Sequence, residues 1–162
     1  MARHGADANV IDLQIIQAPV KKPVTIDQYR YSGFAWRGPE AWDKTNCTLL
    51  TSRGLNRDQA NGSDARWVLV TGPGHDDGTV SVLIMSAASK IAGTAERLRV
   101  WHSKIHHGTP FVNFNPVQAE GLPLDADHPA VSRRQYRVIA ADRSMTSEDA
   151  EAEWKAWRAD LR

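Results

Sequence analysis

The sequence has little cysteine, little charge imbalance and no long apolar run, and each shortage excludes a class of protein. The single cysteine, Cys47, cannot form an internal disulfide, which favours a reducing compartment. The 20 Lys and Arg residues nearly balance the 19 Asp and Glu residues, whereas a nucleic-acid surface needs a basic stripe. No apolar stretch approaches the roughly 20 residues of a membrane helix. We therefore expect neither a nucleic-acid nor a membrane partner.

The length and the first residues bear on domain number and compartment. The chain has 162 residues, enough to bury a core, and we expect one domain over 1–162. The first residues include no apolar segment of the kind that a secretory signal contains. The sequence as it stands therefore predicts a cytoplasmic protein.

Short runs with strand-like composition alternate with Gly, Pro, Asn and Asp along most of the chain. Such regular spacing is typical of an all-β sandwich or barrel. Asp76-Asp77-Gly78 is a turn signal that predicts a hairpin over 66–86. We predict an all-β fold, a mostly antiparallel β-sandwich. The expected strands are 10–16, 29–37, 48–52, 66–71, 79–86, 98–102, 111–117 and 135–141.

One α-helix is predicted at the end of the chain. Thr146 is a candidate N-cap, and Asp149 three residues later completes a capping box. Four apolar residues recur at helical spacing, so that they share one face. They are Ala150, Trp154, Trp157 and Leu161. We expect this face to dock on the sheet.

The segment 30–42 combines aromatic rings, two arginines, a carboxylate and two glycines. Binding grooves use this mixture, because rings stack on a ligand while polar groups fix its orientation. In this interpretation Trp36 or Phe34 stacks on a sugar ring, and Arg37 and Glu40 bind hydroxyl groups. The alternative is that the rings belong to the core and that Arg37 lies along the edge with its head in water.

Three histidines lie close together in sequence, at His102, His106 and His107. Imidazoles can bind a transition metal, with Glu40 or Asp43 completing the set. The spacing matches no known ligand motif, so we predict no metal and no cofactor. His102 alone, as an acid–base or sugar contact, is favoured over the trio.

Arg66 opens a strand after the polar stretch 54–65, on the same face as two valines. An arginine on an apolar face needs a carboxylate or a ligand as partner, and both alternatives stay open. Cys47 has no base or orienting group in a recognisable motif, so a small packed residue is expected there.

Several blocks occur in a characteristic order along the chain. They are Tyr31-Ser32-Gly33-Phe34-Ala35-Trp36-Arg37, Asn46-Cys47-Thr48, Asn61-Gly62, Ala65-Arg66-Trp67, the strand at Met85, Arg99-Val100-Trp101-His102, 111–116 and Tyr136-Arg137-Val138. Taken in order, these blocks resemble the bacterial methane oxygenase PmoA family.

The resemblance covers about 11–157, and the chain is similar to the C-terminal half of the family's longer members. The family implies a soluble β-sandwich, often found beside sugar-degrading genes. A truncated chain would expose an apolar edge and self-associate, and a secretory signal could be lost upstream.

We predict that the protein binds or processes a small-molecule or glycan ligand of carbohydrate type. Trp36, Arg37 and Arg66 are the expected ligand contacts, and Glu40 and His102 the expected acid–base pair. These side chains should meet in one hollow. The alternatives are a non-catalytic interaction module and, as the family name implies, a metal-dependent oxygenase.

Overall fold

The computed structural model describes residues 8–87, 96–124 and 133–161, and within them the fold is all-β with one C-terminal α-helix. Every strand pair is antiparallel, as predicted. The larger sheet has the order β1-β10-β6-β5-β4. Its strands are β1 (Ala8–Ile16), β10 (Arg133–Ala141), β6 (Thr79–Ser86), β5 (Trp67–Pro73) and β4 (Thr48–Thr51).

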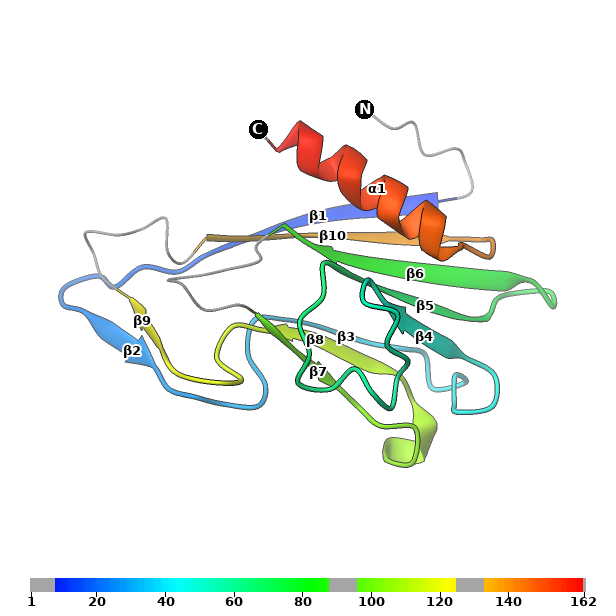
Figure 1. Ribbon diagram of the computed structural model, residues 1–162, viewed down its shortest axis with the longest axis horizontal. Coiled ribbons are helices and arrows are strands. Elements are labelled where there is room, and N and C mark those ends of the chain that lie inside the picture. The colour runs from blue at the N-terminus through cyan, green and yellow to red at the C-terminus, as the bar shows by residue number, and fades with distance from the viewer. Residues whose placement is uncertain (1–7, 88–95, 125–132, 162) are drawn as a thin grey trace.

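A smaller sheet of order β3-β8-β7 packs on one face of the larger sheet, and the helix α1 (Ser147–Asp160) covers the other face (Figure 1). A two-stranded ribbon, β2-β9, extends from one end of the molecule. The remaining elements are β3 (Phe34–Arg37), β7 (Arg97–Val100), β8 (Phe111–Asn115), β2 (Val24–Ile26), β9 (Leu122–Leu124) and a single 3₁₀ turn, η1 (His106–Gly108).

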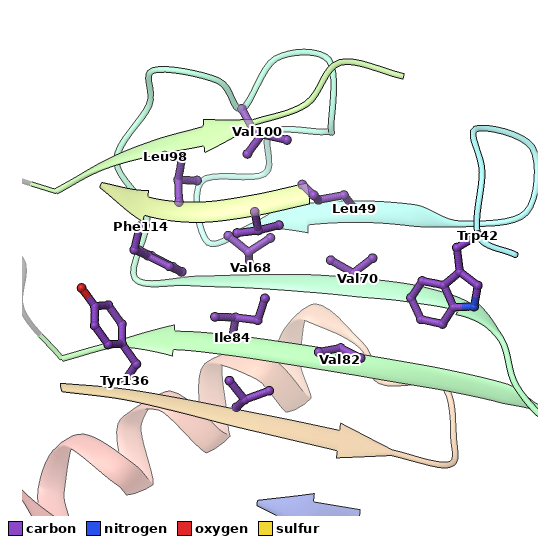
Figure 2. Close-up of a cluster of buried hydrophobic side chains, with 13 residues drawn as sticks. Trp42, Leu49, Val68, Val70, Val82, Ile84, Leu98, Val100, Phe114 and Tyr136 are labelled. Carbon is purple, nitrogen blue, oxygen red and sulfur yellow. The ribbon is translucent and has the colours of Figure 1, made fainter. Parts of the chain in front are cut away.

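The inner core lies between the two sheets. Alternation along β5 points Val68 and Val70 toward the smaller sheet, where both are fully buried. Figure 2 shows these side chains meeting Leu98 and Val100 of β7, with the Tyr136 ring beside Phe114 at one end. Such interdigitation of two inner faces is what defines a sandwich core.

The outer core lies between the larger sheet and α1. Trp67 and Leu69, which alternate with the two valines along β5, point to this side and are also buried. The helix contributes Ala150 and Trp157, which are 0% and 2% exposed. The predicted capping box is present, because Thr146 and Asp149 bond reciprocally at the helix start. The helix therefore docks on the sheet with its apolar face, as expected.

The structure differs from the sequence-based strands in two ways. The strand expected over 29–37 is only four residues long, because Gly33 takes a left-handed conformation (φ 75°) just before Phe34. The ribbon strands β2 and β9 were not predicted, since each has three residues and β9 contains Pro123. The hairpin over 66–86 is confirmed.

None of the helices within the described ranges combines the length and the apolar character needed to cross a membrane.

Docking of α1 gives a first testable prediction. Replacing Trp157 by Ala removes a ring that is 2% exposed, and should lower the free energy of unfolding by about 3–5 kcal/mol through lost contacts and a cavity. Chemical denaturation measures this loss. The control is Lys155→Ala on the exposed side of the same helix, which should change stability by less than about 0.5 kcal/mol. Equal midpoints for the two variants would contradict the docking.

Candidate functional site

A pocket of about 490 Å³ lies at the end of the larger sheet where β4 ends, β5 begins and β6 ends. We call it the α1 pocket, because the helix forms one wall with Trp154 and Arg158. Arg53 and Arg66 come from the strand ends, and Glu96 comes from the residue before β7. The pocket is thus lined by residues from the larger sheet, from α1 and from the segment just before the smaller sheet's β7.

The most unusual group on its wall is Glu96, a carboxyl that is only 5% exposed. Its oxygens accept hydrogen bonds from Ser86 Oγ at 2.7 Å and from the Tyr136 hydroxyl. Burial raises the pKa of Glu96, and these two donors oppose the shift without cancelling it. The pKa of Tyr136 is also raised, by burial and by the charge of Glu96. The result is a desolvated carboxyl at a cavity wall, an arrangement typical of functional sites.

Arg134 lies on the same inward face of β10 as Tyr136 and is 1% exposed. Its Nη2 donates to Gln17 Oε1, while Nε and Nη1 have no hydrogen-bond partner in the described part of the chain. The positive charge of Arg134 acts on Glu96 in the direction that lowers the pKa of the carboxyl. The buried Arg134 guanidinium therefore places a positive charge near the Glu96 carboxyl.

Arg66 has the carboxylate partner, one of the two alternatives that the sequence left open. Its Nη2 lies 2.9 Å from Glu151 Oε2 of α1, which also accepts from Trp67 Nε1 at 2.9 Å. The ion pair leaves about half of the Arg66 side chain exposed on the pocket wall. Its Cζ lies 5.0 Å from the ring centroid of Trp154, whose Nε1 donates to the Ser86 carbonyl. A structural ion pair thus holds Arg66 at the pocket.

Asp64 is the second carboxyl on the wall, and its environment is opposite to that of Glu96. It is hydrogen-bonded to Arg53, and this bond lowers the pKa of Asp64. Asp64 also has 40% of its side chain exposed, so desolvation opposes the charged form only weakly. Within one pocket, the pKa of one carboxyl is raised and the pKa of the other is lowered.

The other sequence-predicted site residues lie on the smaller sheet and its loops. Trp36 meets Trp42 edge to face at 6.2 Å and packs against the inner core, as in the core alternative. Arg37 is exposed, with its Cζ 4.5 Å from the Trp101 ring centroid. Glu40 is exposed in the loop after β3. None of these three lines the α1 pocket with Arg66.

His102 is exposed and is also outside the α1 pocket. Its Nδ1 lies 3.3 Å from Asp58 Oδ1, and the Lys104 backbone N–H donates to the same nitrogen at 3.2 Å. In the neutral ring Nδ1 therefore accepts from the backbone, and the ion pair with Asp58 forms only when the ring is protonated.

The neighbouring histidines form a tight turn. His106 and His107 both have positive φ, 52° and 56°, and the His106 ring lies 3.8 Å from that of Trp101. The buried Arg57 guanidinium donates to the carbonyls of Trp101, Gly108 and Thr109, which fastens the turn. Among the described residues no three His, Cys, Asp or Glu side chains are arranged to hold a metal. The histidine spacing therefore belongs to a structural turn.

The sequence analysis did not identify Glu96 and Trp154 as pocket residues. It also did not identify Arg134 and Tyr136, the buried residues next to the Glu96 carboxyl. Arg134 did carry a signal, because it shares a strand face with Tyr136 and Val138, and a charge on an apolar face needs a reason. Glu96 carried none, since its burial depends on how β7 meets β6 and β10.

The comparison with protein families places the chain. A family model described as a family of unknown function, DUF6807, matches residues 1–155. The chain belongs to DUF6807. No curated protein matches the chain. No solved structure matches it. DUF6807 membership assigns no activity, and the resemblance to the PmoA family stays a prediction.

The Glu96 environment predicts a specific pH dependence of stability. Because the pKa is raised above its ordinary value of 4.5, the folded state binds this proton more tightly than the unfolded state. Its contribution to stability is full below pH 4.5 and is lost as the pH rises through the folded-state pKa. Urea denaturation from pH 4 upward (~0.5-unit steps) should show a shallower decline for Glu96→Gln.

The matched variant is Tyr136→Phe, which keeps the carboxyl but removes a donor that lowers its pKa. In Tyr136→Phe the free energy of unfolding should still fall as the pH rises, and this fall should extend to higher pH. Parallel pH profiles for the native chain and Glu96→Gln would show that Glu96 does not titrate as its surroundings imply.

Proposed function

We propose that this protein binds and processes a carbohydrate-like ligand in the α1 pocket. The observation that carries the proposal is the buried Glu96 carboxyl on a wall that also holds Trp154 and Arg66. Sugars are recognised by an aromatic ring together with a few fixed polar groups, and the α1 pocket offers both. Its volume of about 490 Å³ suits one or two sugar rings.

The two carboxyls on the wall support processing in addition to binding. Two titratable groups with pKa values pushed in opposite directions mark the acid and the base of a site. Glu96, with its raised pKa, is the proton donor, and Asp64, with its lowered pKa, is the carboxylate that accepts a proton or stabilises positive charge. Glycoside cleavage uses such a pair on either side of the scissile bond.

The residues predicted from sequence alone enter this proposal unequally. Arg66 takes part as a pocket contact. Trp36, Arg37, Glu40 and His102 do not line the α1 pocket and stay predictions, with Glu40 and His102 as the competing acid–base pair. In the alternative of a non-catalytic module, the α1 pocket binds the ligand but no reaction takes place there.

The test compares two isosteric changes, Glu96→Gln and Glu40→Gln, on a panel of oligosaccharides. Turnover should fall about 10²–10⁴-fold in Glu96→Gln, the range for loss of a general acid, and should be unchanged in Glu40→Gln. Product release is followed by chromatography and ligand affinity by calorimetry.

Two outcomes would contradict the proposal. Loss of turnover in Glu40→Gln instead would move the chemistry to the smaller sheet. Binding without turnover in the native chain, at equal affinity in both variants, would support the non-catalytic module.

A further inference from the structure

The α1 pocket has more positive than negative charge on its wall. Its guanidinium groups belong to Arg53, Arg66 and Arg158, and its carboxyls to Asp64 and Glu96. The Arg53–Asp64 pair is internally neutral. The Glu96 carboxyl is buried and accepts from Ser86 and Tyr136, and it forms no ion pair with an arginine of the wall among the described residues. Two guanidinium groups then remain, on Arg66 and Arg158.

The carboxylates near these two arginines do not balance them. Glu151, the partner of Arg66, also accepts from Trp67 Nε1 and lies 3.7 Å from Lys155 Nζ, so one carboxylate faces two cations. Arg158 has no carboxylate partner within the described ranges of the chain. Its Cζ instead lies 6.0 Å from the ring centroid of Trp154.

The two guanidinium groups are held around the same ring. Arg66 approaches Trp154 from the start of β5, and Arg158 comes from the next turn of α1. Both are exposed, so water screens their mutual repulsion to a large extent. An anion that reaches both still gains from them, because guanidinium groups bind carboxylate and phosphate through paired hydrogen bonds.

We propose that the ligand of the α1 pocket is an acidic sugar, whose anionic group is bound by Arg158 and Arg66 at Trp154. This rests on the proposed function and narrows it, because a neutral sugar would leave Arg158 without a counter-charge and Arg66 with a carboxylate that it shares with Lys155. The shared chemistry is an anion on a polyhydroxylated ring, as in a uronic acid or a sugar phosphate. The remainder of the sugar then faces Glu96 and Asp64.

The test uses calorimetry on the full chain with glucuronic acid, glucose 6-phosphate, glucose and acetate. At least one acidic sugar should bind about tenfold or more tightly than glucose, and the better of the two identifies carboxylate or phosphate. Arg158→Gln should remove that advantage, lowering the affinity for the acidic sugar about tenfold, to about that for glucose. Arg158 is exposed and makes no ion pair among the described residues, so this variant should fold.

The matched control is Arg30→Gln, an exposed arginine that also lies over an aromatic ring, that of Tyr31. It should leave every affinity unchanged. Glucose binding as tightly as both acidic sugars would overturn the inference and leave the proposed function standing. Acetate binding as tightly as glucuronic acid, or no sugar binding at all, would overturn the proposed function and the inference with it.

Discussion

The central strands β5 and β6 carry apolar side chains on both faces, and this constraint determines where the other elements must lie. Val68 and Ile84 need a cover on one side, and Leu69 and Leu83 need one on the other. A single antiparallel sheet with one face in water could not satisfy both. The smaller sheet covers the first face and α1 the second, so the sandwich and the terminal helix answer the same demand.

The candidate site follows from how these layers end. Apolar packing stops at Ser86, the last residue of β6, and polar groups from all three layers gather there. Glu96 is buried because Tyr136 and Ser86 close over it from the larger sheet, whereas Asp64 stays near water beside Arg53. One side of the pocket is therefore buried and the other is exposed to solvent. This difference contributes to the opposite pKa shifts of its two carboxyls.

Local signals in the sequence were enough for much of the fold. The capping box at Thr146 and the turn at Asp76-Asp77-Gly78 depend only on neighbours in the chain, and both elements formed where expected. Long-range effects were not readable in the same way. Arg66 was recognisable as a charge that needs a partner, but the sequence placed it on the face of the two valines, which point to the smaller sheet. Arg66 instead contacts Glu151 and Trp154 on the opposite side, and this contact depends on helix docking. The burial and the raised pKa of Glu96 depend on β6 and β10, which are distant in sequence, so no local pattern predicts them.

The shared wall of the α1 pocket couples recognition to the docking of the helix. Arg66 and Glu151 join strand to helix, and Trp154 is fastened to the Ser86 carbonyl, so the cavity exists only while α1 is seated. A molecule that occupies the cavity therefore stabilises the docked position of α1. Its apparent affinity is proportional to the fraction of chains in which α1 is docked. Any event that detaches α1 from the sheet would therefore abolish the pocket without changing a carboxyl.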